Sequence, residues 1–199
     1  IMGLLSSTKN TVILKGDKSL SKRDFKRVIE PLNFFGVVIN SKNGTLPLKL
    51  KGSELIRPIK YVEKKGSAQV KTCIILSAIN APGLTTIKAK KSRNHTELIL
   101  KHLNYPIKIR KGKIYDLIEI EGREQFKSFN YKVPGDISSA SFFIVLTLLS
   151  KKSELLIKDI NINLSRLGIL KILNRMNANI RIVNQRKYKG EMLGDLKIK

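Results

Sequence analysis

Short apolar runs, spaced at either strand or helix periodicity, predict a chain of alternating strands and helices. Residues 68–78 are apolar on most sides and follow Ser67, a good N-cap, so they predict a helix. The segment Asn80-Ala81-Pro82-Gly83 contains the residues that end helices. Residues 85–89 are rich in β-branched side chains and therefore predict a strand directly after this turn.

A second helix is predicted after this strand. Ser92 is its expected N-cap, Thr96-Glu97 lie in its first turn, and the residues that follow form an apolar stripe at helical spacing. Two strands at 107–110 and 117–120, joined by a turn at Gly112-Lys113, come next. The order from residue 67 onward is therefore helix, strand, helix, strand, strand.

This pattern recurs along the chain at intervals of about 70 residues, which indicates internal repeats. A strand before the first helix would complete the order βαβαββ, and residues 55–62 and 125–133 hold candidates for it. We expect one truncated α/β domain over residues 1–199, built with its helices inside. It is expected to begin with the tail of a helix at 1–5 and to end within a strand. Its repeats are predicted at 1–52, 53–122 and 123–199. The landmarks that recur are the pairs Leu32-Asn33, Leu103-Asn104 and Leu173-Asn174 and the arginines Arg23, Arg93 and Arg166.

Composition narrows the possible functions. The formal net charge is +24, but the basic residues are spread along the chain, as in the lysine-rich proteins of AT-rich genes. Aromatic residues make up 6% of the chain and include no Trp, so a base-stacking platform is poorly supplied. We expect no nucleic-acid partner, and a basic nucleic-acid-binding module remains an alternative of a different class.

The sequence offers little for metals, disulfides or membranes. A single cysteine, Cys73, excludes an internal disulfide, and on an apolar helix face it is interpreted as a buried small hydrophobe. The histidines, His95 and His102, are a weak basis for a metal centre, and His95 is interpreted as a hydrogen-bonded polar residue rather than a catalyst. The longest apolar run, 142–149, is far shorter than the roughly 20 residues that span a bilayer. We expect no membrane partner and no signal peptide.

Polar residues at the predicted helix starts carry the candidate chemistry. A helix start offers free backbone N–H groups and a partial positive charge, so it favours phosphates and carboxylates. Arginine adds a bidentate fork for the same anions. Equivalent helix starts in repeated units can converge on one ligand, although each taken singly is also a plain N-cap or surface residue. The residues concerned are Ser67, Ala68 and Gln69, Ser92 and Arg93, Ser21, Lys22 and Arg23, and Asp136, Ile137, Ser138 and Ser139.

Five motifs in this order resemble the 5-enolpyruvylshikimate-3-phosphate synthase family over the whole length of the chain. The resemblance implies a two-domain enzyme, each domain an inside-out α/β barrel of three βαβαββ units, of which this chain holds one domain. It implies transfer of the enolpyruvyl group of phosphoenolpyruvate to the 5-hydroxyl of shikimate 3-phosphate, with release of phosphate, by addition and elimination. The motifs are Gly16–Arg23, Gly66–Lys71, Ala81–Thr86, Ser92–Glu97 and Val133–Phe143.

The same resemblance implies roles for six residues. Shikimate 3-phosphate would be bound by Ser67, Ala68, Gln69, Ser92 and Arg93, and phosphoenolpyruvate by Arg23 and Gln69. It implies no metal or organic cofactor, a cytoplasmic location in chorismate synthesis, and a missing second domain as partner of a monomer. Asp24 and Asn94 depart from the family's usual Pro and Asp.

The family's proton-transfer groups, including its Lys-Glu-x-x-Arg motif, do not occur in this sequence. We therefore assign no catalytic residue and expect no turnover by this chain alone. The related UDP-N-acetylglucosamine enolpyruvyl transferase is the alternative within the same fold, because its repeated units look alike.

Overall fold

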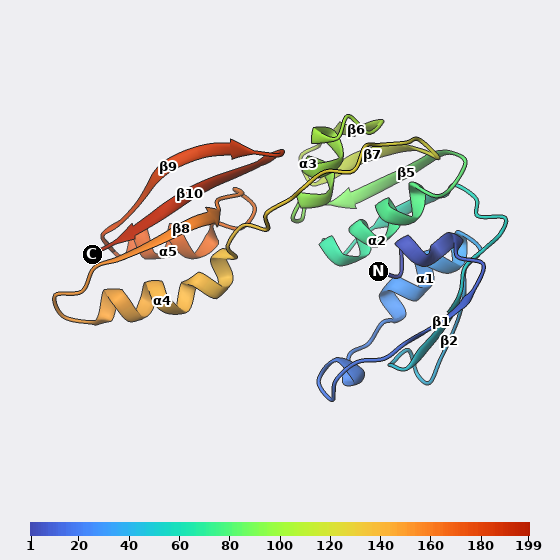
Figure 1. Ribbon diagram of the computed structural model, residues 1–199, viewed down its shortest axis with the longest axis horizontal. Coiled ribbons are helices and arrows are strands. Elements are labelled where there is room, and N and C mark those ends of the chain that lie inside the picture. The colour runs from blue at the N-terminus through green and yellow to red at the C-terminus, as the bar shows by residue number, and fades with distance from the viewer. The chain divides into compact units, whose positions relative to one another are not determined.

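The computed structural model describes all residues from Ile1 to Lys199, and they form two compact units (Figure 1). Unit 1 comprises Ile1–Ser92 and Asn104–Phe126, and unit 2 comprises Arg93–Leu103 and Lys127–Lys199. Each predicted repeat contains one β-sheet. The grouping of the three repeats into one domain, with the boundaries given above, stays a prediction.

The first sheet of unit 1 is antiparallel and has the order β1-β3-β2. The alternation of leucine and lysine in β3 explains which face of this sheet is buried. Leu48 and Leu50 are buried, while Lys49 and Lys51 are exposed to solvent. The strands are β1 (Thr11–Leu14), β2 (Val38–Ser41) and β3 (Leu48–Lys51), and helix α1 (Lys26–Phe34) connects the first two.

The second sheet of unit 1 has the order β4-β5-β7-β6, and its repeat shows the complete βαβαββ order. β4 and β5 are parallel and helix α2 (Ala68–Ala78) connects them, while the other pairs are antiparallel. The strands are β4 (Lys60–Glu63), β5 (Gly83–Lys90), β6 (Ile107–Arg110) and β7 (Tyr115–Gly122).

Helix α2 lies in the core of unit 1, where Ile74, Ile75 and Ala78 are fully buried. It packs against α1, and β7 ends close to its last turn. A side chain at Gly122 would place its Cβ 1.8 Å from the carbonyl oxygen of Ala81, so only glycine allows this approach. This packing fixes the start of α2, which carries the candidate residues Ser67 to Gln69.

Unit 2 consists of an antiparallel sheet with the order β8-β10-β9 and three helices. One apolar core joins α4 and α5 to this sheet through Ile144, Leu170 and Leu196 (Figure 1, orange and red). The elements are α3 (His95–His102), α4 (Ile137–Leu149), β8 (Leu155–Asn161), α5 (Gly168–Arg175), β9 (Ile180–Tyr188) and β10 (Glu191–Ile198).

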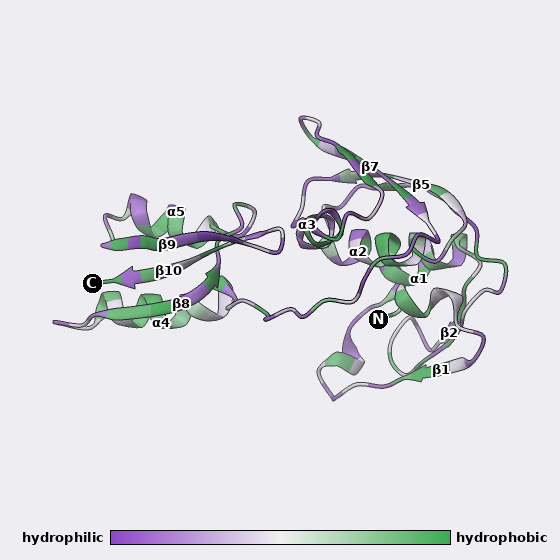
Figure 2. Ribbon diagram, turned by 45° about the horizontal axis from the view of Figure 1, so that its top comes forward, coloured by the Kyte–Doolittle hydropathy of each residue, from purple (hydrophilic) through white to green (hydrophobic).

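Helix α4 is apolar on most sides, and its ribbon is mostly green in Figure 2. Ile144 is buried, whereas Phe142, Phe143, Leu146 and Leu149 are exposed by 60% or more of their surface. Burial of a helix inside its unit, as expected, is seen for α2, while this face of α4 is exposed in this chain.

Most predicted elements are confirmed. α2 and β6 have the predicted limits, and β5 and β7 include the predicted runs. The strand expected at 55–62 is shorter and later, because β4 begins at Lys60, beyond Pro58. No helix in the structure is long and apolar enough to cross a membrane.

Three local predictions are wrong. No strand forms at 125–133; only an isolated parallel bridge joins Gly135 to Ile160 of β8. The expected helix tail at 1–5 is a 3₁₀ turn, η1 (Leu4–Ser7). Arg23 does not open a helix, because it follows a second 3₁₀ turn, η2 (Leu20–Lys22), and α1 begins only at Lys26.

Candidate functional site

The start of α2 has the arrangement predicted from the sequence. Ser67 is the N-cap, and its Oγ accepts a hydrogen bond of 3.3 Å from the N–H of Val70. Ala68 is the first helical residue and Gln69 is exposed beside it. The small side chains at 67 and 68 leave the first N–H groups of the helix approachable by an anion.

Arg27 of α1 orients the side chain of Gln69. Its Nη2 donates a 2.6 Å hydrogen bond to Oε1 of Gln69. Because the amide oxygen accepts from a guanidinium, the amide NH₂ of Gln69 keeps both donors for another acceptor. The contact joins α1 to α2 in unit 1 and leaves a hydrogen-bond donor at the helix start.

Arg23 lies four residues before Arg27. It is exposed, its backbone N–H bonds to the carbonyl of Leu20, and its guanidinium makes no hydrogen bond or ion pair. An exposed arginine without a partner is available to an anionic ligand. The contact between Arg27 and Gln69 brings the segment that follows Arg23 to the start of α2.

Ser92 and Arg93 lie between β5 and α3. Oγ of Ser92 is buried and has no hydrogen-bond partner, and Arg93 is exposed without an ion pair. The prediction that Ser92 caps α3 is wrong, because the helix begins at His95 and Asn94 holds the N-cap position. A buried unpaired hydroxyl is costly, so Ser92 presents an unused polar group beside an unused guanidinium.

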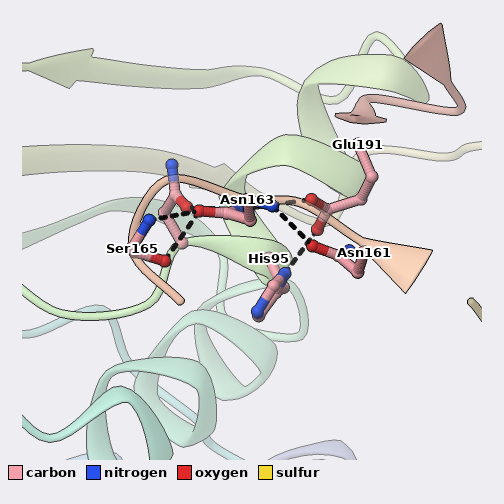
Figure 3. Close-up of polar contacts among 6 residues, drawn as sticks. His95, Asn161, Asn163, Ser165 and Glu191 are labelled. Carbon is pink, nitrogen blue, oxygen red and sulfur yellow. Dashed lines mark hydrogen bonds and ion pairs between the residues drawn. The ribbon is translucent and has the colours of Figure 1, made fainter. Parts of the chain in front are cut away.

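The start of α3 is held by a buried polar network (Figure 3). Oε1 of Glu191 lies 2.5 Å from Nδ1 of His95, and Oε2 accepts a 3.3 Å hydrogen bond from Nδ2 of Asn163. The same Nδ2 donates to Oδ1 of Asn94 at 2.9 Å. The interpretation of His95 as a hydrogen-bonded polar residue is confirmed. All these residues belong to unit 2.

A cavity of about 200 Å³ lies beside this network in unit 2. His95 and Glu191 line it together with Asp136 and Ile137, the N-cap and the first residue of α4. Arg166 also lines it and pairs with the carboxylate of Asp136, and its Nη2 donates a 2.7 Å hydrogen bond to Oγ of Ser138. An arginine and a helix start thus bind a carboxylate within this chain.

Asp136 is the N-cap of α4, as its place at a predicted helix start indicates. Partial burial raises the pKa of its carboxyl, but hydrogen bonds from the backbone N–H of Ser138 and the charge of Arg166 outweigh this and lower the pKa below its ordinary value. The pairing of Arg166 with Asp136 shows the type of contact that the resemblance assigns to Arg93 and a ligand.

Cys73 has no chemical role in this site. Its side chain is buried in α2, and burial raises the pKa of the thiol to about 12, so it is a thiol at neutral pH. No group of three or more His, Cys, Asp or Glu side chains is arranged to hold a metal ion.

The predicted site residues are divided between the two units. Arg93 lies in unit 2, and the other five lie in unit 1: Arg23, Ser67, Ala68, Gln69 and Ser92. Their convergence on one ligand stays a prediction.

Sequence reasoning missed three residues that contact this machinery: Arg27, Asn163 and Glu191. Arg27 carries no clear signal in the sequence, because it contacts Gln69 from 42 residues away. Asn163 and Glu191 carry no such signal, because each contacts α3 from a segment distant in the sequence.

Comparison with known proteins gives one family. Residues 1–197 match the sequence profile of EPSP synthase (3-phosphoshikimate 1-carboxyvinyltransferase). A 3-phosphoshikimate 1-carboxyvinyltransferase from Ruthia magnifica subsp. Calyptogena magnifica is 42% identical over 199 residues, which is 100% of this chain and 45% of the relative. The chain thus spans about half the length of the curated relatives it matches.

Solved structures that resemble this chain agree with the family match. An EPSP synthase from Acinetobacter baumannii superposes with a TM-score of 0.82 at 33% identity, over 100% of this chain and 44% of that one. The enolpyruvyl transferase NikO from Streptomyces tendae has a TM-score of 0.64 at 16% identity, over 97% and 45% of the two chains, and shares the fold. The expected fold class, that of the enolpyruvyl transferases, is confirmed.

Proposed function

Because this chain belongs to the EPSP synthase family, we propose that it supplies substrate-binding groups of a 3-phosphoshikimate 1-carboxyvinyltransferase. In the addition step, the 5-hydroxyl of shikimate 3-phosphate loses its proton, its oxygen bonds to C2 of phosphoenolpyruvate, and C3 gains a proton as the C2=C3 double bond is used. In the elimination step, C3 loses a proton, the bond from C2 to the phosphate oxygen breaks, the double bond re-forms, and inorganic phosphate leaves. Family membership also supports a cytoplasmic place in chorismate synthesis.

The observation that carries this proposal is the pair of unused groups at 92 and 93. Ser92 Oγ is buried without a partner, and the adjacent Arg93 has a free guanidinium. A phosphate accepts hydrogen bonds from a hydroxyl and from two nitrogens of a guanidinium at once. The 3-phosphate of shikimate 3-phosphate would therefore satisfy both residues.

The start of α2 supplies the second part of the proposed site. Ser67 and the N–H of Ala68 offer donors at a helix N-terminus, and Gln69 offers its amide NH₂. Each substrate carries a phosphate and a carboxylate, so donors suit them better than acceptors do. Arg23, with its free guanidinium, is proposed to bind phosphoenolpyruvate together with Gln69.

The chain by itself is proposed to bind substrate without turning it over. The proton-transfer groups expected from the resemblance do not occur among its residues, and the curated relatives are about twice its length. The rest of such a protein is the partner that we propose. The exposed apolar face of α4 supports this, because a helix face of this kind is normally covered.

The alternative within the fold, a UDP-N-acetylglucosamine enolpyruvyl transferase, has less support. The curated relatives described above carry the 3-phosphoshikimate name, and the profile of that family covers residues 1–197. Shikimate 3-phosphate is therefore the substrate to test first.

Isothermal titration calorimetry of the 199-residue chain with shikimate 3-phosphate tests the proposal. We expect saturable binding, and we expect Arg93→Ala to weaken it by about ten-fold or more, because a charge-assisted contact with phosphate is lost.

Arg175→Ala is the matched control. Arg175 is also exposed in unit 2, and its loss removes the same charge. If both variants weaken binding equally, the loss in Arg93→Ala results from the lower net charge of the chain and not from a specific contact. Absence of binding, with salt-sensitive binding of DNA or RNA instead, would favour the basic nucleic-acid-binding module.

A further inference from the structure

We infer that Asn163 and Glu191 are positioning residues, which fix the start of α3 and thereby aim Arg93 at the phosphate of shikimate 3-phosphate. The inference rests on the proposed function for the identity of the ligand. The contacts themselves lie entirely within unit 2.

The two residues directly after Arg93 are both held by side chains from distant segments. Asn94 accepts a 2.9 Å hydrogen bond from Asn163, and His95 contacts Glu191 at 2.5 Å. A carboxylate can only accept, so Nδ1 of His95 is the donor in this pair. Asn163 comes from the loop after β8, and Glu191 is the first residue of β10.

The network is buried and internally satisfied, which makes it rigid. Glu191 is 1% exposed and Asn163 is 8% exposed. Oδ1 of Asn163 accepts from the N–H and the Oγ of Ser165 at 2.9 and 2.7 Å, so its orientation is fixed, and Figure 3 shows these contacts together. Buried, fully bonded groups of this kind define one arrangement, because any other leaves a polar atom unpaired.

The turn before β10 brings Glu191 unusually close to α3. Gly190 has φ +88°, and a Cβ at this position would lie 2.5 Å from the carbonyl oxygen of Leu98. Only glycine fits both the backbone conformation and the space. The close approach places the carboxylate of Glu191 within reach of the first turn of the helix.

The start of α3 depends on this network because it has no cap of its own. Asn94 occupies the N-cap position but makes no capping hydrogen bond, since its oxygen accepts from Asn163 instead. The side chain of Arg93 has no contact that would hold it, so its direction follows from the backbone at 93–95. A small displacement of this backbone moves a guanidinium out of bidentate reach.

Two substitutions break the network selectively. Glu191→Gln keeps the size of the side chain but offers one oxygen to two donors, so one of the contacts to His95 and Asn163 is lost. Asn163→Asp keeps the oxygen that accepts from Ser165, and replaces the NH₂ that bonds to Asn94 and Glu191 by an acceptor.

Asp195→Asn is a matched control on the same strand. Asp195 is also buried, at 7% exposure, and accepts 2.9 Å hydrogen bonds from the N–H of Asp159 and from Nδ2 of Asn184. Asp195→Asn also removes one of two hydrogen-bond acceptors from a side chain of β10, but at a place away from α3. Any loss of affinity in this variant therefore measures the effect of destabilising unit 2 without disturbing the start of α3.

The experiment measures affinity for shikimate 3-phosphate by calorimetry and amide hydrogen exchange at residues 93–98. We expect Glu191→Gln and Asn163→Asp to weaken binding by about ten-fold and to speed exchange at 93–98. Asp195→Asn should leave both within about two-fold of the parent chain. Parent-like affinity in both network variants, or an equal loss in Asp195→Asn, would overturn the inference.

The exchange measurement separates this inference from the proposed function. If the parent chain binds no shikimate 3-phosphate, the proposed function fails. Faster exchange at 93–98 in Glu191→Gln would then still support the network as the element that fixes the start of α3, and unchanged exchange would refute it.

Discussion

At the scale of single residues, the orientation of the Gln69 amide is the feature that matters most for the proposed site. Its oxygen faces Arg27, so its NH₂ is left for a ligand. A reversed amide would present an acceptor to phosphate and carboxylate groups and would repel them. Arg27 therefore affects ligand binding although it is assigned no contact with substrate.

Arg27→Ala tests this orientation. We expect the affinity for shikimate 3-phosphate, measured by calorimetry, to fall about five-fold, because the amide of Gln69 loses the bond that fixes it. Lys26→Ala removes the same charge from the preceding exposed residue, which has no side-chain partner, and should change affinity less than about two-fold. Equal effects of the two variants would contradict the prediction.

Residues whose roles depend on neighbours in sequence were the predictable ones. Ser67 and Asp136 are N-caps as expected, and Cys73 is buried as expected, because helical spacing and capping are local properties. Ser92 was wrongly expected to cap α3. Its hydroxyl is buried instead, and the helix start is held by Asn163 and Glu191, whose contacts arise only on folding.

At the scale of elements, the sequence predicts strands and helices with strong hydrophobic periodicity well. It does not predict a segment that joins a sheet through one isolated β-bridge. Residues 125–133 contain alternating apolar residues, but Pro134 follows them and only Gly135 pairs with β8. The pattern therefore resembled a strand that the sheet of unit 2 does not contain.

The first turn of α4 supports a prediction about pH. Asp136→Ala should lower the free energy of unfolding by about 1 kcal/mol, because the helix loses its N-cap and Arg166 loses its partner. The pKa of Asp136 is lower in the folded chain than its ordinary value of 3.8. Its contribution is therefore complete above that value and is lost as the pH falls through the folded pKa.

Urea unfolding followed by circular dichroism provides the measurement. The difference between the parent chain and Asp136→Ala should be clear at about pH 7 and smaller at about pH 3. A difference that grows on acidification would contradict the assigned shift. Ser153→Ala, at a half-buried residue of the loop after α4 whose side chain bonds only to the nearby carbonyl of Lys151, is the control substitution.

At the scale of the whole chain, the exposed face of α4 is the clearest unsatisfied feature. Phe142→Ser with Leu149→Ser should reduce the binding of a hydrophobic dye, because both side chains are about 80% exposed. Stability should change by less than about 0.5 kcal/mol. Ile144→Ala, in the same helix but fully buried, should cost about 3 kcal/mol. Unchanged dye binding in the double variant would show that another surface binds the dye.

The course of the chain through its two units has a consequence for any shortened form. The segment 93–103, which contains α3, belongs to unit 2 but is encoded between β5 and β6 of unit 1, so the polypeptide passes from one unit to the other three times. A form that stopped after Phe126 would keep Arg93 and α3 but would lose β10 and the loop after β8. The segment that carries the guanidinium of Arg93 would then lack the contacts of its backbone neighbours with Asn163 and Glu191. A separately expressed piece covering 127–199 would be needed to restore these contacts.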